Sequence, residues 1–67
     1  AKPEPEIYQH ACEGLGVEPG KALFIDDRAE NVDGARAFGL NAVQFVSLEQ
    51  LAEDLRRMSA PLPPIFA

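Results

Sequence analysis

The segment that decides the fold is Ala22-Leu23-Phe24-Ile25-Asp26-Asp27. Its run of four apolar residues is typical of a strand that is buried on both faces, as in parallel sheets covered by helices. The predicted strand, residues 22–26, ends on two adjacent carboxylates. Ligands of open parallel sheets bind beyond the carboxyl ends of the strands, and carboxylates are preferred ligands of hard cations such as Mg²⁺. Asp26 and Asp27 are therefore the first candidates for a metal site.

The stretch before this strand predicts a helix over residues 4–15. Its apolar residues recur every three to four positions, which places them in one stripe: Ile7, Tyr8, Ala11, Cys12 and Leu15. Gly16 is suited to the position after the helix, where the backbone often adopts a left-handed conformation. Pro19-Gly20 then predicts a type II turn into the strand. We expect Tyr8 and Cys12 in the core and His10 on the exposed face.

The stretch after the strand predicts a second helix that ends at Gly39. Asp27 is followed three residues later by Glu30, which resembles a capping box at the start of this helix. Asp27 therefore has two possible roles, as a helix cap and as a metal ligand. Asn31, in the first turn, is suited either to local capping or to orienting the two acids.

The rest of the chain predicts a second strand over 41–46 and a third helix. Gln44 in the middle of this strand indicates an edge or a partly solvated face. Ser47 and Gln50 form another capping box, and the helix that follows has an apolar stripe of Leu48, Leu51, Leu55 and Met58. Three prolines predict an irregular or polyproline-like tail over residues 59–67. We therefore divide the chain into a domain over 1–58 and a proline-rich tail.

The predicted element order is α-β-α-β-α, which is an α/β, Rossmann-like partial domain. The crossover between the two strands should form a right-handed parallel βαβ unit. Two strands do not make a stable sheet alone, and one lateral edge of strand 22–26 has no predicted partner. An unpaired edge favours association with another strand. We therefore expect self-association, or pairing with a missing N-terminal half.

Composition excludes several classes of function. The chain has 67 residues and a formal charge of −5, which argues against binding nucleic acid or an anionic membrane surface. No apolar run approaches the roughly 20 residues of a membrane-spanning helix. Cys12 is the single cysteine, which fits a reducing, cytoplasmic location. The chain starts without Met, so we expect it to be cut from a longer protein.

Several polar groups are expected to meet at one edge of the sheet. The first helix is about 18 Å long at 1.5 Å per residue, and the strand returns over a similar distance. Lys2, Asp26, Asp27 and the start of the second helix should then lie together. Two acids, a cation and a helix N-terminus suit a phosphate group held with Mg²⁺.

These residues together resemble the C-terminal half of the core domain of haloacid dehalogenase-like hydrolases. The resemblance extends over residues 2–58 in the family's order and spacing, and the residues that carry it are Lys2-Pro3, Pro5, Ile7-Tyr8, Leu15-Gly16-Val17, Phe24-Ile25-Asp26-Asp27, Asn31-Val32, Gly34-Ala35 and Phe38-Gly39. It implies that Lys2 steadies the nucleophile and the phosphoryl charge. It also implies that Asp26 and Asp27 hold Mg²⁺, directly and through water, and that Asn31 is the asparagine that often follows these acids.

The acidic pair also indicates a branch of the family. The dehalogenases proper tend to have a Ser-Ser-Asn type string at this point and use no metal. The chain is therefore more similar to the phosphatase branch, and in particular to the phosphatase-like domains of soluble epoxide hydrolases. The resemblance implies a parent enzyme that hydrolyses a phosphorylated small molecule through an aspartyl-phosphate.

The chain departs from the family in one large respect. The family's nucleophile lies in an Asp-x-Asp motif, and this chain has none; it also has no Thr, and its two Ser lie too late for the second motif. The helical cap of many members is absent too. We expect the chain alone to be inactive.

Two other functions remain open from the residues. One is a non-catalytic α/β interaction or dimerisation module, in which the acidic pair only caps a helix and Leu62, Ile65 and Phe66 contact a partner. The other is a receiver-like domain that is phosphorylated on an Asp. This second alternative is disfavoured, because no Asp closes strand 41–46.

Overall fold

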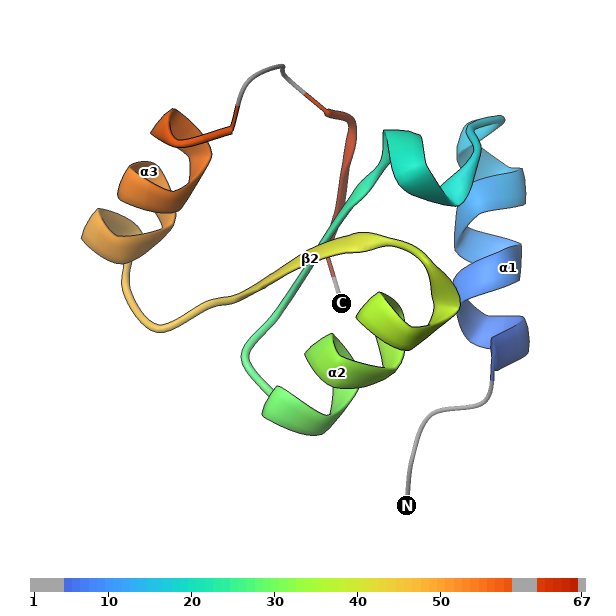
Figure 1. The fold of residues 1–67 in the computed structure, drawn as a ribbon, viewed down its shortest axis with the longest axis horizontal. Helices are drawn as coiled ribbons and strands as arrows, with labels where there is room; N and C mark the ends of the chain where they lie inside the picture. The colour runs from blue at the N-terminus through green and yellow to red at the C-terminus, as the bar shows by residue number, and fades with distance from the viewer. Residues whose placement is uncertain (1–4, 59–61, 67) are drawn as a thin grey trace.

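A three-stranded parallel sheet organises the part of the chain that the computed structural model describes, residues 5–58 and 62–66 (Figure 1). The central strand, β1 (Leu23–Asp26), lies between β2 (Asn41–Gln44) and β3 (Pro64–Phe66). The helices are α1 (Pro5–Leu15), α2 (Ala29–Phe38) and α3 (Leu48–Arg56), and a short 3-10 helix, η1 (Pro19–Lys21), precedes β1. The α/β class and the α-β-α-β-α order are confirmed, with a further parallel strand at the end.

This further strand, β3, comes from the proline-rich tail. Pro64, Ile65 and Phe66 pair in parallel with Leu23, Phe24 and Ile25, and the Leu23 N–H donates to the Pro63 carbonyl at 3.0 Å. Prolines are compatible with an edge strand because their missing N–H groups are not needed at positions that face outward. The prediction of an irregular tail was therefore wrong for Pro64–Phe66. The expectation that one edge of β1 has no partner was wrong for the same reason.

The core lies on the face of the sheet that α1 and α2 cover. Phe24 from β1 and Ala22, just before this strand, pack there with Tyr8 and Cys12 from α1, together with Val32, Ala35, Leu40 and Ala42. Tyr8 and Cys12 are thus core residues, as predicted, and His10 is exposed. The β1 residues alternate between the two faces of the sheet, so Leu23 and Ile25 belong to the opposite face.

The helix ends agree with the glycines that were expected to make them. Gly16 follows α1 with φ 70°, and Gly39 follows α2 with φ 113°. At both ends the glycine and the next residue donate back to carbonyls of the last helical turn, which is the Schellman arrangement. Pro19 and Gly20, by contrast, belong to a 3-10 turn and not to the type II turn that we predicted.

The start of α2 differs from the prediction. Arg28, and not Asp27, is the N-cap residue, and its side chain makes no capping hydrogen bond. The Arg28 N–H instead donates to Oδ1 of Asp26, two residues earlier, at 3.0 Å. This is an Asx turn, and it moves the helix start one residue beyond the predicted position because Asp26 satisfies the backbone locally. The predicted Asp27–Glu30 capping box is therefore not formed.

The outer edge of β2 is covered by side chains. The Phe45 N–H donates to the Asp26 carbonyl, so the carbonyls of Ala42 and Gln44, three and one residues earlier, face away from β1. The Arg36 guanidinium donates to the Ala42 carbonyl at 3.0 and 3.3 Å, and Gln50 Nε2 donates to the Gln44 carbonyl at 2.9 Å. Residues 41–44 thus form an edge strand, as Gln44 indicated, and its outward acceptors are occupied.

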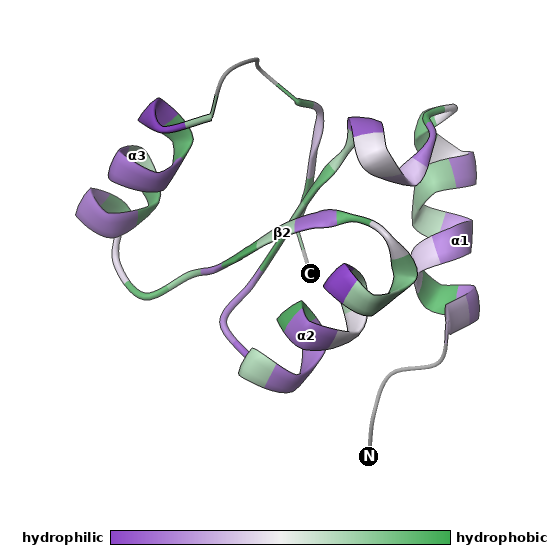
Figure 2. Ribbon diagram, in the orientation of Figure 1, coloured by the Kyte–Doolittle hydropathy of each residue, from purple (hydrophilic) through white to green (hydrophobic). Residues whose placement is uncertain are grey.

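The third helix, α3, lies to one side of the α1, α2 and sheet layers (Figure 1). Its predicted capping box is confirmed, because Ser47 accepts from the Gln50 N–H while the Gln50 side chain accepts from the Ser47 N–H. The helix nevertheless contains no buried residue, and Leu48 is 73% exposed. Figure 2 shows that polar residues cover most of its outer side. No helix in the described ranges has the length and apolar character needed to span a bilayer.

Candidate metal and phosphate site

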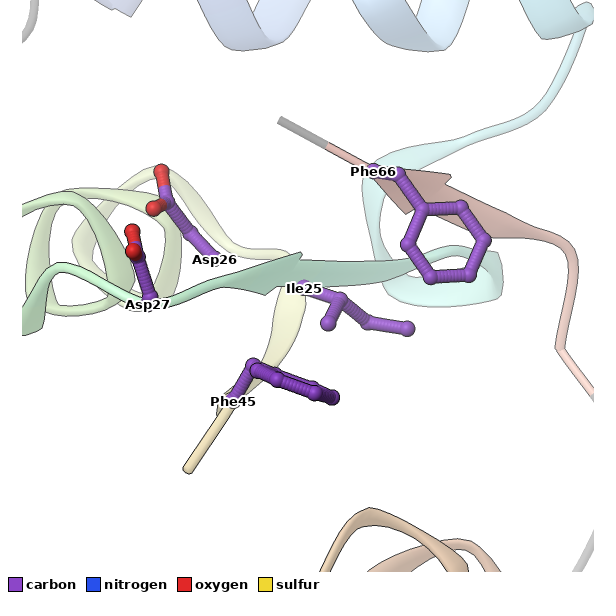
Figure 3. Close-up of a pocket in the computed structure, with 5 residues that line it drawn as sticks. All are labelled: Ile25, Asp26, Asp27, Phe45 and Phe66. Carbon is purple, nitrogen blue, oxygen red and sulfur yellow. The ribbon is translucent and has the colours of Figure 1, made fainter. Parts of the chain in front are cut away.

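The predicted acidic site lies where β1 ends and α2 begins. An open pocket of about 320 Å³ is lined there by Ile25, Asp26, Asp27, Phe45 and Phe66. Figure 3 shows the two carboxylates on one side of β1, Ile25 and Phe45 on the other, and Phe66 on the neighbouring strand. The pocket therefore has an acidic margin and an apolar margin at the carboxyl end of the central strand.

Asp26 is buried, and both of its carboxylate oxygens are hydrogen-bonded. Its residue exposure is 6%; Oδ1 accepts from the Arg28 N–H at 3.0 Å, and Oδ2 accepts from Asn31 Nδ2 at 2.8 Å. Burial by itself raises the pKa of this carboxyl, but hydrogen bonds from Arg28, Asn31 and Asp27 together outweigh burial and hold the pKa below its ordinary value. Asp26 is therefore a fixed, ionised carboxylate at neutral pH.

Asn31 reaches Asp26 because α2 starts immediately beyond β1. Its position in the first turn places its side-chain amide next to Oδ2 of Asp26, five residues earlier. Its backbone carbonyl accepts from the Tyr8 hydroxyl of α1 at 2.8 Å. Asn31 thus contacts both Asp26 and Tyr8, and its role in orienting a metal ligand stays a prediction.

Asp27 is exposed beside Asp26, and its backbone is held from β2. The Gln44 side chain donates from Nε2 to the Asp27 carbonyl at 3.0 Å. The Asp27 carboxylate and that of Asp26 point to the same side of β1 in Figure 3. The structure therefore brings the two acids together at one pocket. Lys2, the remaining predicted site residue, lies outside the described residues, and its role stays a prediction.

The donor groups present fit a hard cation, with most ligands still to be supplied. Within residues 5–58 and 62–66, no three His, Cys, Asp or Glu side chains form a cluster that could hold a metal by itself. Each oxygen of the Asp26 carboxylate accepts one hydrogen bond and retains a second acceptor site. Mg²⁺ is commonly held by one or two carboxylates, with water and substrate phosphate completing the set. Asp26 and Asp27 match that pattern.

Comparison with known proteins agrees with this geometry. Residues 1–39 match the family model described as haloacid dehalogenase-like hydrolase. This match covers more than half of the chain. The chain belongs to the haloacid dehalogenase-like hydrolase family.

The relatives of this family member include both phosphatases and dehalogenases. Flavin mononucleotide hydrolase 1 of Arabidopsis thaliana is 44% identical over 54 residues, which are 81% of this chain and 22% of the relative. (S)-2-haloacid dehalogenase 4A of Burkholderia cepacia is 46% identical over 44 residues, 66% of this chain and 19% of the relative. A phosphatase of Mycobacterium tuberculosis is 50% identical over 42 residues, which are 63% of this chain and 19% of the relative. The chain thus spans about a fifth of the length of these relatives.

Sequence reasoning missed two residues that shape the site of this hydrolase chain. We assigned Tyr8 only to the core, whereas its hydroxyl binds the first turn of α2. We used Gln44 only as a sign of an edge strand, whereas its amide holds the backbone of Asp27. The available signal for Tyr8 was chemical, because a buried Tyr hydroxyl needs a hydrogen-bond partner. Gln44 is exposed, and the sequence carried no signal for its contact.

Proposed function

We propose that this chain carries the Mg²⁺-binding half of a phosphomonoester phosphatase that acts through an aspartyl-phosphate. The observation that carries the proposal is the pair of carboxylates at the end of β1, one of which, Asp26, is ionised and held by two hydrogen bonds. The nucleophilic Asp would be supplied from outside this chain. The substrate would be a phosphorylated small molecule in the cytoplasm.

The residues of this chain would divide the work by position. Asp26 would bind the ion at the strand end, and Asp27 would complete its coordination directly or through water. Asn31 and the Arg28 N–H would keep the Asp26 carboxylate in one orientation. Lys2 would offset negative charge on the nucleophile and on the phosphoryl group. When bound, Mg²⁺ would supply electrostatic stabilisation of the phosphoryl oxygens.

Dehalogenase chemistry is the second candidate, because two relatives that are 46% and 44% identical over 44 residues are (S)-2-haloacid dehalogenases. The acidic pair favours the phosphatase. A pair of carboxylates beside an incoming haloacid anion would repel it, whereas the same pair binds a phosphate through an intervening cation. Metal dependence therefore separates the two candidates.

The test is a titration of the ¹⁵N-labelled chain with Mg²⁺, followed through its amide signals. We expect shifts confined to the end of β1 and the start of α2, with a Kd on the order of millimolar because water fills most coordination positions. Asp26→Asn should weaken binding at least about tenfold, consistent with loss of one charged ligand. Glu30→Gln, which removes a nearby exposed acid from α2, is the matched control and should change little.

Two results would overturn the proposal. One is an absence of shifts at Asp26 and Asp27 at tens of millimolar Mg²⁺, which would favour a non-catalytic interaction or dimerisation module. The other is an equal loss of affinity in Asp26→Asn and Glu30→Gln, which would mean diffuse attraction to a negative surface. An aryl phosphate assay completes the test. The chain alone should not turn over, and turnover abolished by Asp26→Asn would place a nucleophile within it.

A further inference from the structure

One buried hydroxyl connects α1 to the start of α2. Tyr8 is 1% exposed, and its hydroxyl donates to the backbone carbonyl of Asn31 at 2.8 Å, across 23 positions of sequence. The Tyr8 ring packs edge-on against Phe24 of β1 with centroids 5.2 Å apart, and against Phe38 of α2 at 5.8 Å. Tyr8 therefore contacts the strand that ends in Asp26 and the helix that begins beside it.

The residue that accepts from Tyr8 also donates to the acid. The backbone carbonyl of Asn31 binds the Tyr8 hydroxyl, while its side-chain amide binds Oδ2 of Asp26 at 2.8 Å. The other oxygen, Oδ1, accepts from the Arg28 N–H, the N-cap residue of the same helix. Both carboxylate oxygens are thus held from the first turn of α2. The orientation of the carboxylate consequently depends on where that turn lies relative to β1.

Packing alone does not require a hydroxyl at this position. A phenylalanine ring could make the same contacts with Phe24 and Phe38, and it would avoid burying a polar group. Burying a hydroxyl is unfavourable unless a hydrogen bond compensates for it. In this chain the bond is made to a single carbonyl in the first turn of α2. The hydroxyl therefore adds a directional contact that fixes the turn, which an apolar ring would leave free to shift.

We propose that Tyr8 is a positioning residue for Asp26, acting through the Asn31 carbonyl and the first turn of α2. Its hydroxyl keeps the turn at the distance at which the Asn31 amide and the Arg28 N–H both reach the carboxylate. That Tyr8 orients Asp26 stands on the geometry of the chain without metal. That this orientation raises metal affinity rests on the proposed function.

The hydroxyl is also suited to remain a donor. Burial raises the pKa of Tyr8, and the negative charge of Asp26 raises it further. Tyr8 therefore stays protonated throughout the neutral range, and the contact to Asn31 does not depend on pH there.

The first experiment compares Tyr8→Phe with the unchanged chain, without metal. We expect the ¹H–¹⁵N signals of the Asn31 side-chain amide and of the Arg28 N–H to shift, and the exchange of both with solvent to accelerate. Cys12→Ala is the matched control, because Cys12 is buried one turn further along the same face of α1 and contributes to the same core. Cys12→Ala should lower the free energy of unfolding while leaving these two signals in place. Unchanged signals in Tyr8→Phe, or equal changes in both variants, would overturn the positioning role.

The second experiment measures Mg²⁺ affinity in the same variants. We expect Tyr8→Phe to weaken binding about 3- to 10-fold, less than the roughly 10- to 100-fold typical when a direct partner of a metal ligand is removed. A change in the Asn31 signals with unchanged affinity would overturn the effect on the metal and leave the positioning role supported. If the unchanged chain binds no Mg²⁺, the proposed function fails, while the metal-free signals still decide the role of Tyr8.

A double-mutant cycle distinguishes the proposed coupling between Tyr8 and Asn31 from a general loss of packing. Asn31→Ala removes the amide between Tyr8 and Asp26. Asn31→Ala keeps the backbone carbonyl and the Arg28 contact, so adding Tyr8→Phe to it should cost less Mg²⁺ affinity than Tyr8→Phe costs in the unchanged chain, by the part that passes through the Asn31 amide. Full additivity of the two losses would overturn the proposed route.

Discussion

Asp26 is a buried carboxylate that stays charged because the start of a helix solvates it. The Arg28 N–H and the Asn31 amide replace water that burial removes, and together with hydrogen bonds from Asp27 their effect on the pKa of Asp26 exceeds that of burial. The cost of burying a charge is thereby offset by hydrogen bonds to the charged form. In its proposed role as a metal ligand, Asp26 would bind a cation more tightly because of this arrangement, since its carboxylate is already ionised and oriented.

The lowered pKa of Asp26 makes stability depend on pH. In the unfolded chain this carboxyl titrates near its ordinary value of about 3.9. Its pKa is lower in the folded state, so the charged carboxylate stabilises the fold. This contribution to the free energy of unfolding is complete at pH values above the unfolded pKa. The contribution is lost as the pH falls through the folded pKa. We therefore expect Asp26→Asn to reduce the loss of stability between pH 6 and pH 2, measured by urea unfolding.

The control for this pH experiment is Glu49→Gln, an exposed acid on α3. It should leave the pH dependence of unfolding close to that of the unchanged chain. A pH dependence that falls equally in both variants would mean that net charge, and not the hydrogen bonds of Asp26, controls acid stability.

At the level of helices, two glycines form a matched pair that tests how backbone conformation contributes to stability. Gly39 follows α2 with φ 113°, where a side chain is strained, so Gly39→Ala should lower the free energy of unfolding by about 1–2 kcal/mol. Gly14 lies within α1 at negative φ with open space around its Cα, so Gly14→Ala should raise it by about 0.5–1 kcal/mol. Thermal unfolding followed by circular dichroism would measure both. Equal effects of the same sign would contradict the backbone explanation.

Elements that depend on neighbouring residues were predictable from the sequence, and those that depend on distant partners were not. The Ser47–Gln50 capping box and the glycine ends of α1 and α2 are set within a few residues. β3 is not, because three residues that include a proline have little strand preference and pair only because β1 presents an open edge. The prediction that Asp27 caps α2 was wrong, because the Asp26 side chain accepts from the Arg28 N–H and the N-cap residue is Arg28.

The same division applies to the candidate site. The two acids could be located because a strand end fixes them, and they do line one pocket. The Tyr8–Asn31 contact could not be predicted, since it needs the relative placement of α1 and α2 across 23 positions. The role of Lys2 is a sequence prediction that the described residues leave untested.

For the molecule as a whole, the three helices differ in how closely they pack against the rest of the chain. Helices α1 and α2 bury one face, whereas α3 contains no buried residue. Exposed apolar side chains remain at Val46, Leu48 and Phe66. Together with the length of the relatives, this arrangement supports the proposal that the chain associates with the rest of a longer protein or with a second copy.

Deleting residues 59–67 tests the contribution of the tail to this behaviour. The deletion removes β3 and leaves Leu23, Phe24 and Ile25 without their partners on that side. An unpaired strand edge favours association, so we expect the shortened chain to form dimers at concentrations at which the full chain is monomeric. Sedimentation velocity would measure both. A shortened chain that stays monomeric with slow amide exchange along 23–26 would contradict this expectation.

The side-chain cover on β2 determines how far such association can proceed. With the Ala42 and Gln44 carbonyls already occupied by Arg36 and Gln50, that edge offers an incoming strand few acceptors. Sheets that join at both edges build open-ended fibres, whereas sheets that join at one edge are complete with two copies around a twofold axis. A chain that has lost β3 therefore has one free strand edge, and we expect it to form dimers but no larger assembly.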